Sequence, residues 1–259
     1  FRPRLAEAMN LSEEQILFTA THNHAGPGTG DNFLPLLEAA SDQYVAYLKE
    51  ALLATCKNLR KHYEEASLTL HKVHIPCSIN RRKLVNGKIL MEPNPKQAIT
   101  QEAKILTLSR KKGIETTTQH DVLVHIVHYP CHATSSAENA LHSEYPGVIR
   151  KALETHYPDS ITVFLQGATA DIRPNISENG HFVKKDYSET LRFGQTVADV
   201  LLDALKDEGQ YIEPKLRLRH TQIILPLKPK YDKDVLTNTD LEDAKWDFVW
   251  AKKVSEQSP

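Results

Sequence analysis

Two histidines one residue apart stand in the segment TATHNHAGPG, residues 19–28. Imidazole is the commonest metal ligand among side chains and a preferred nitrogen ligand of zinc. In an extended backbone, residues i and i+2 project from the same face, so His22 and His24 can address one point. A hydrogen-bonded surface pair is the alternative. The Gly-Pro-Gly turn at 26–28 favours a binding site, because glycine lets a backbone approach a ligand closely.

Two further polar segments, HYPCHATSS at 128–136 and LQGATADIRPN at 165–175, follow apolar runs that predict buried strands. His132 lies just beyond its strand and is the better candidate ligand. His125 lies inside that strand, where a hydrogen-bonded core histidine is expected, and His128 is ambiguous. Because α/β proteins bind ligands beyond the carboxyl ends of their strands, we expect the three loops to form one site.

Other side chains near these segments have a functional or a structural interpretation. Asp171 either orients an imidazole or accepts a proton, or it satisfies backbone amides in a turn. Arg81 and Arg82 either clamp a substrate carbonyl or carboxylate, or are solvated. Glu144 is interpreted as a helix N-terminal carboxylate, and Cys131 as a buried structural thiol.

The elements that position these residues alternate between helix and strand. Periodicity and capping residues predict helices at 2–10, 41–62 with Ser41 as N-cap, 145–157, 188–209 between Ser188 and Gly209, and 239–256. Apolar and alternating runs predict strands at 15–20, 67–75, 104–109, 121–130, 160–167 and 215–227, with a hairpin at Asn86-Gly87 in the long excursion 80–103. This order predicts an α/β fold with a mixed, mostly parallel sheet flanked by helices and an active site at the carboxyl ends of the strands.

Composition narrows the class of protein. The chain has 259 residues and a formal net charge of −1, so no electrostatic argument favours nucleic acid or an anionic membrane as partner. No run of 18 apolar residues predicts a transmembrane segment. The three cysteines are widely spaced and are expected to be reduced thiols, which, with no visible signal peptide, favours a cytoplasmic location. We expect 1–259 to form a single domain within a longer chain, since Phe1 is not an initiator methionine.

Taken together, these segments resemble the neutral/alkaline ceramidases. TATHNHAGPG resembles their THTHSGPG segment, HYPCHATSS their second histidine block, LHSEYPG their S-A-D-Y-P-G stretch, and QGATADIRPN their Q-G-A-A-G-D-I-N-P block, while INRR fits a basic position. The blocks follow the family order over roughly residues 1–227.

The resemblance implies a zinc-dependent amidohydrolase that cleaves an N-acyl amide, such as a ceramide-like lipid, with a metal-activated water. It assigns zinc binding to His22 and His132, catalytic support to His24, and substrate or charge stabilisation to Arg81. Asp171 joins His24 as a candidate proton donor to the leaving amine.

The sequence also departs from the family. The late glutamate and tyrosine ligands have no counterpart, since no P-G-E motif occurs, and we expect them in sequence outside this chain. Ala170 and Arg173 replace a family glycine and serine. Two alternatives stay open: a metal-dependent esterase or phosphatase on the same site, and a non-catalytic binding protein with a decayed site. The oligomeric state is open as well.

Overall fold

The computed structural model describes residues 1–30, 40–59, 63–111, 119–183, 185–217, 221 and 223–224. It divides the chain into two compact units. The smaller contains the first two α-helices, and the larger contains residues 17–26 and all the strands. All candidate site residues belong to the larger unit, which is therefore sufficient to describe the site.

The smaller unit has helices where the sequence predicted them. α1, Arg2–Met9, ends at Asn10, whose φ of 53° is the left-handed conformation typical of a helix C-cap. The 3-10 turn η1 spans Glu13–Gln15. α2, Asp42–Leu59, follows Ser41, whose hydroxyl accepts a hydrogen bond from a first-turn amide at 3.4 Å. The predicted N-cap of α2 is confirmed.

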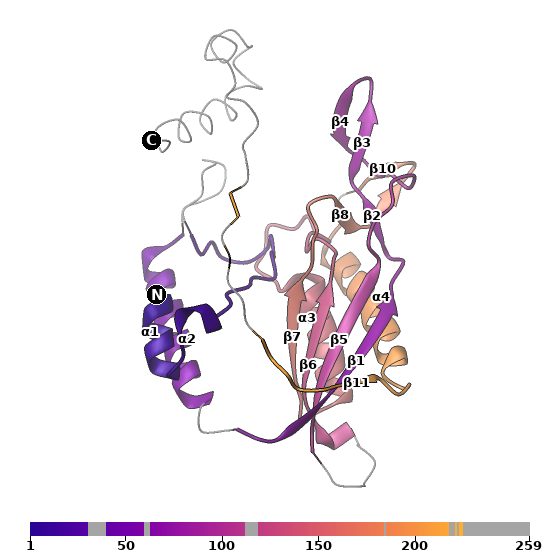
Figure 1. Ribbon diagram of the computed structural model, residues 1–259. Helices are drawn as coiled ribbons and strands as arrows, with labels where there is room; N and C mark the ends of the chain where they lie inside the picture. The colour runs from indigo at the N-terminus through magenta and orange to yellow at the C-terminus, as the bar shows by residue number, and fades with distance from the viewer. Residues whose placement is uncertain are drawn as a thin grey trace. The chain divides into compact units, whose positions relative to one another are not determined.

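The larger unit is built on a five-stranded sheet in the order β11-β1-β5-β6-β7 (Figure 1). Its strands are β1 Ala66–His74, β5 Glu102–Arg110, β6 Val122–Tyr129, β7 Ile161–Gln166 and β11 Gln210–Ile212. Only β6 and β7 pair in parallel, and the other three pairs are antiparallel.

The α/β class is therefore confirmed, but the expectation of a mostly parallel sheet is wrong. Parallel neighbours require a crossover connection, usually a helix. Among these strands, α3, Glu144–His156, forms such a crossover between β6 and β7. β6 pairs antiparallel with β5, and the described residues just before β6 form the short turn η2, Gln119–Asp121.

Two helices pack on the sheet and form the core. α3 and α4, Tyr187–Ala204, contribute apolar residues at helical spacing, including Ile149, Leu153, Val197 and Leu201. These side chains meet alternate residues of the strands, such as Ile105 and Val127, in one cluster. The core thus holds the ends of β6 and β7 at fixed positions, and the loops that follow these strands start from a rigid base.

The ends of α4 differ from the prediction. Asp186, not Ser188, is the N-cap, because its backbone is extended and its carboxylate accepts the Ser188 amide at 3.0 Å. The helix ends at Ala204 rather than at Gly209. Gly209 packs against the His71 ring of β1, and the next residue begins β11, which pairs with β1. The helix must therefore stop early so that the chain can reach this edge of the sheet.

Three small pairs of strands complete the larger unit. β2, Ser78–Asn80, pairs with β8, Ile172–Pro174, and β9, Ser177–Glu178, pairs with β10, His181–Phe182. β3, Arg82–Val85, and β4, Lys88–Met91, form the predicted hairpin. Its two turn residues, Asn86 and Gly87, have φ of 49° and 79°, as a two-residue hairpin turn requires.

Two strand predictions fail. Residues 16–20 form no strand, because among the described residues no partner strand pairs with them, and Leu17 is 85% exposed. In the predicted strand 215–227, residues 215–217 do not belong to a strand, and most of the remainder lies outside the described residues. The predicted helix 239–256 lies outside them as well. No helix in the described ranges has the length and apolarity that crossing a membrane requires.

Candidate metal centre

His132 follows β6 in a loop whose backbone is held from several sides. The Tyr145 hydroxyl and the Gln166 side-chain amide both donate to the carbonyl oxygen of Cys131, the latter at 2.9 Å. The His132 amide donates to the Ile172 carbonyl oxygen at 3.2 Å. Because β6 and β7 are parallel, their carboxyl ends lie at the same sheet edge, so these bonds join two neighbouring loops there.

The loops that follow β6 and β7 can approach each other closely because residue 167 is glycine. Its amide donates to the Tyr129 carbonyl oxygen at 3.1 Å, and a Cβ added to it would lie 2.9 Å from both Pro130 Cα and His128 Nε2. A larger residue would push the loop after β7 away from the loop after β6. The ambiguous His128 therefore packs under the end of β7, and the described contacts do not include it in the histidine group.

The segment with His22 and His24 is a turn and not the extended backbone that the sequence predicted. The Asn23 carboxamide accepts the Ala25 amide at 2.7 Å and donates to the His142 carbonyl oxygen at 2.7 Å. The His142 amide in turn donates to Ala25 at 3.1 Å. The Asn23 side chain thus makes hydrogen bonds that a neighbouring strand would otherwise make, and it stabilises a turn here. His22 has φ of 55°, a strained conformation for a residue other than glycine.

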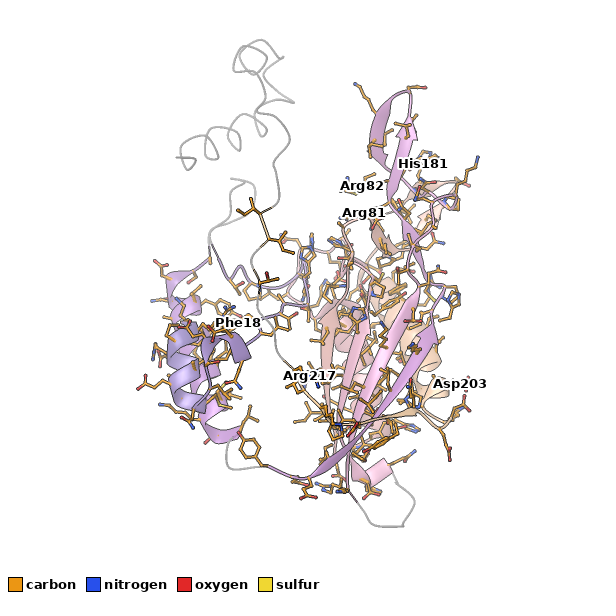
Figure 2. All side chains as sticks on the ribbon, in the orientation of Figure 1. Phe18, Arg81, Arg82, His181, Asp203 and Arg217 are labelled. Carbon is orange, nitrogen blue, oxygen red and sulfur yellow. The ribbon has the colours of Figure 1, made fainter. Side chains whose placement is uncertain are left out.

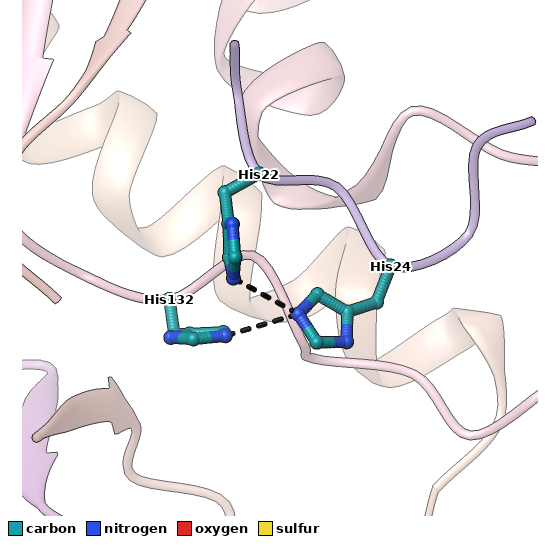
Figure 3. A group of neighbouring side chains, drawn as sticks. All are labelled: His22, His24 and His132. Carbon is teal, nitrogen blue, oxygen red and sulfur yellow. Dashed lines mark hydrogen bonds between the residues drawn. The ribbon is translucent and has the colours of Figure 1, made fainter. Parts of the chain in front are cut away.

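The three rings converge despite this turn (Figure 3). His24 Nε2 lies 3.1 Å from His22 Nε2 and 3.0 Å from His132 Nε2. Ring centroids are 4.5–5.0 Å apart. The potential ligand atoms of all three residues lie within 4.8 Å of one another, which is compatible with one shared metal ion. The sequence predicted one site from three loops: the first two bring their histidines together, and the third contributes the Thr169 carbonyl oxygen that His132 contacts.

The protonation state suits metal binding. His132 Nδ1 lies 3.2 Å from the Thr169 carbonyl oxygen, which can only accept a hydrogen bond, so Nδ1 carries the proton and Nε2 presents its lone pair. Burial, together with the charge of Arg81, lowers the pKa of His132 to about 4. Burial also lowers the pKa of His24, with further contributions from His22 and Arg81. Both imidazoles are therefore neutral near pH 7.

Two arginines bring positive charge to the group. Arg81 precedes β3, and its Nε donates to the Ala170 carbonyl oxygen at 3.1 Å. Arg173 in β8 donates to the Thr134 carbonyl oxygen at 3.3 Å, and its guanidinium lies 4.4 Å from the centroid of the Phe182 ring. Burial, followed by the charge of Arg81, lowers the pKa of Arg173. The sequence identified Arg81 but treated Arg173 only as a departure from the family pattern.

Asp171 does not join the histidines. Its carboxylate accepts the Asn80 side-chain amide at 3.0 Å, and its carbonyl oxygen accepts the Arg81 amide at 2.7 Å. The Asp171 carboxylate therefore holds a side-chain amide of the neighbouring strand β2 rather than the backbone amides of a turn. The exposed Arg82 makes its bonds through the backbone, donating to Asn80 Oδ1 at 2.7 Å and accepting from Asn94 Nδ2 at 2.7 Å.

Glu144 has a larger part than the sequence indicated. It is 1% exposed with φ of 51°, and its carboxylate accepts the Ser135 amide at 2.9 Å, the Ser135 hydroxyl and the Ser136 amide at 3.3 Å. The Ser135 hydroxyl also lies 2.9 Å from Thr190 Oγ1 of α4. Through these hydrogen bonds, Glu144 holds the loop that begins at His132 against the start of α3. The only sequence signal was its place in the LHSEYPG block.

Two structural interpretations from the sequence are confirmed. His125 is 1% exposed, and its Nδ1 lies 3.0 Å from Thr107 Oγ1 of the neighbouring strand. Cys131 is fully buried, and burial raises the pKa of its thiol well above the usual value. All three cysteines are free thiols. Neither His125 nor Cys131 belongs to the described group of potential metal ligands.

Comparison with solved structures identifies a similar fold. The chain is similar to a structure described as a ceramidase complexed with C2, with a TM-score of 0.61 and 14% identity, over 83% of this chain and 36% of that one. It is also similar to neutral ceramidase from Pseudomonas aeruginosa, with a TM-score of 0.60 and 12% identity over the same shares. The chain therefore spans about a third of the length of these structures. No known protein family and no curated protein matches the sequence.

Proposed function

We propose that this chain, with its ceramidase-like fold, carries the histidine site of a zinc-dependent amidohydrolase that acts on an N-acyl amide of a ceramide-like lipid. The observation that carries the proposal is the convergence of three imidazoles, whose potential ligand atoms lie within 4.8 Å of one another, on loops that the fold holds together. The resemblance of the sequence blocks to ceramidases supports the same reaction class.

The donor set fits zinc. Catalytic zinc sites use three protein ligands, imidazoles prominent among them, and keep one position open. Two imidazoles of this group would supply two of these ligands, and the further family ligands are expected in sequence outside this chain. A zinc ion bound here would supply Lewis-acid polarisation of a carbonyl and a nucleophile from water at neutral pH. We assign metal binding to His22 and His132. His132 is oriented for this role by Thr169, which fixes its tautomer.

His24 is assigned the proton transfers. Its pKa is lowered by burial and by its neighbours, so it is neutral and able to accept a proton at neutral pH. The His24 imidazole can then give that proton to the leaving amine, which must be protonated for the amide C–N bond to break. Asp171, which the sequence also named for this donation, is assigned instead to holding the loop next to Arg81 through its bonds to Asn80 and to the Arg81 amide.

Arg81 and Arg173 are assigned charge stabilisation. Negative charge develops on the amide oxygen during attack, and each well-placed donor to such an oxygen contributes roughly 3–4 kcal/mol. Both guanidinium groups lower the pKa of His24, after the larger effects of burial and of His22, which supports this assignment. The released fatty acid is an anion, and its carboxylate would be attracted to the guanidinium groups of Arg81 and Arg173.

The proposal is tested by metal content and hydrolysis in His22→Ala and His132→Ala. Wild type should bind zinc in a one-to-one ratio and release fatty acid from an N-acyl amine. Each variant should lose zinc at micromolar concentrations, with activity falling by about 100-fold or more. The matched control is His120→Ala, an exposed histidine bonded to Asp159. Stoichiometric zinc in both site variants would contradict the ligand assignment.

The substrate panel separates the alternatives. Release of fatty acid from amides is expected to exceed release from the corresponding esters and release of phosphate from phosphate esters. Faster ester or phosphate hydrolysis, abolished in the same two variants, would assign another hydrolase chemistry to the site. Stoichiometric zinc without turnover of any of these compounds would identify a metal-binding protein with no hydrolase activity.

A further inference from the structure

The β3–β4 hairpin presents apolar side chains to solvent. In an antiparallel pair, cross-strand partners share a face, and the register pairs Arg82 with Met91 and Leu84 with Ile89. Leu84, Ile89 and Met91 are 66%, 59% and 55% exposed. Figure 1 shows the hairpin extending away from the five-stranded sheet. An apolar face of this kind on a projecting hairpin is typical of an interaction site.

The charges of the hairpin are of one sign. Residues 81–91, RRKLVNGKILM, contain four cationic side chains and no acidic one. The next residue, Glu92, is the first anion, and its carboxylate accepts from the His181 ring at 3.0 Å. The net charge of −1 gives no electrostatic argument for an anionic surface as partner, but it averages over a segment that is locally basic.

We propose that this hairpin binds an anionic lipid surface, with Leu84, Ile89 and Met91 in the interfacial region and its lysines and arginines at the head groups. Apolar side chains gain free energy by leaving water for the acyl boundary, and each nearby lysine or arginine adds electrostatic attraction to anionic lipids. Both features are needed, because either alone gives weak binding. A nucleic acid would use the cations but would leave the apolar face in water.

The base of the hairpin is tied to the histidine site. Asn80 is 2% exposed and bonds both the Arg82 amide and the Asp171 carboxylate, while the Arg81 amide bonds the Asp171 carbonyl oxygen. Arg81 and Arg82 lie at this base (Figure 2). A lipid surface held by the hairpin would therefore stand next to the loop 169–173. Delivery of a lipid substrate to the site rests on the proposed function, whereas vesicle binding does not.

Vesicle co-sedimentation of the full chain tests the proposal. Wild type should bind vesicles of phosphatidylcholine mixed with phosphatidylserine, and bind vesicles of phosphatidylcholine alone more weakly. Replacing the apolar face, Leu84→Gln with Ile89→Gln and Met91→Gln, should weaken binding about tenfold or more. The matched control replaces exposed apolar residues elsewhere, Ile161→Gln with Leu191→Gln and Tyr211→Gln.

The charge contribution is tested separately. Lys83→Gln with Lys88→Gln should weaken binding to anionic vesicles about tenfold, whereas the exposed pair Lys72→Gln with Lys151→Gln should change it little. Equal binding by wild type and the triple apolar variant would overturn the proposal. So would a triple variant that binds vesicles normally but changes the oligomeric state in solution, which would assign the face to a second copy. Zinc content is measured in every variant, so loss of the metal site is detected independently.

Discussion

Buried imidazoles in this chain are kept neutral, and the partner of one ring nitrogen decides what the other can do. The pKa of both His125 and His132 is lowered to about 4, in each case mainly by burial. His125 Nδ1 contacts a threonine hydroxyl between two strands, so its ring is part of the sheet. His132 Nδ1 contacts a loop carbonyl, and its Nε2 faces His24. Of these two histidines, only His132 lies, within the described residues, close enough to other potential ligands to share a metal with them.

We predict that His125 makes the fold sensitive to acid. Its folded pKa of about 4 lies below the unfolded value of 6.5, so only the unfolded state binds this proton between these pH values. Stability from this residue is therefore complete above pH 6.5 and is lost as the pH falls, by roughly 2 kcal/mol at pH 5. His125→Gln should show a smaller loss of unfolding free energy between pH 7 and pH 5 in urea titrations.

The control for this prediction is His74→Gln, an exposed histidine on β1. It should retain the acid sensitivity of wild type. Equal losses in wild type and in both variants would mean that other groups dominate the pH dependence.

Residue type and spacing were sufficient to find the three histidines, because each stands in a polar loop beside glycine or proline near the predicted strand ends. They were sufficient for His125 too, since a polar residue inside an apolar run needs a partner. They were insufficient for Glu144. Its importance depends on its positive φ and on amides from Ser135 and Ser136, and both are long-range outcomes of folding.

At the level of elements, the site depends on how strand ends and helix starts are joined. The carboxyl ends of β6 and β7 and the start of α3 meet in a network of backbone and side-chain bonds. Glu144 contributes the only carboxylate described in this network, with three donors pointing at it. Periodicity located the strands and α3, but it could not indicate which loop amides turn toward a helix start.

We predict that Glu144→Gln destabilises the larger unit. The amide group would place its own donor hydrogens against donors from Ser135 and Ser136, leaving buried groups unsatisfied. Unsatisfied groups of this kind cost about 1–3 kcal/mol each. Thermal unfolding should occur at a lower temperature, and zinc affinity should fall because the loop begins at His132. Glu208→Gln, at an exposed glutamate, serves as the control, and equal midpoints for the two variants would contradict the prediction.

At the scale of the molecule, the α/β class followed from alternating patterns, whereas the strand directions did not. A single pattern of helix and strand admits both directions, and the connections decide: only a connection long enough for a crossover gives parallel neighbours. The run at 15–20 was apolar enough for a strand but has no described partner, and a strand exists only through its partner. These contacts are set by the whole chain and not by local periodicity.

Metal binding should be measurable as stability of the larger unit, since His22, His24 and His132 all belong to it. An ion that binds only the folded state stabilises it by about 2.7 kcal/mol at 100 times its dissociation constant. For a chain of this length that corresponds to a rise of roughly 5–10 °C in the unfolding midpoint. Hydrogen exchange should slow at 22–25 and 130–136, where the ligands are. His132→Ala should show neither effect, and an equal rise in that variant would place the ion elsewhere.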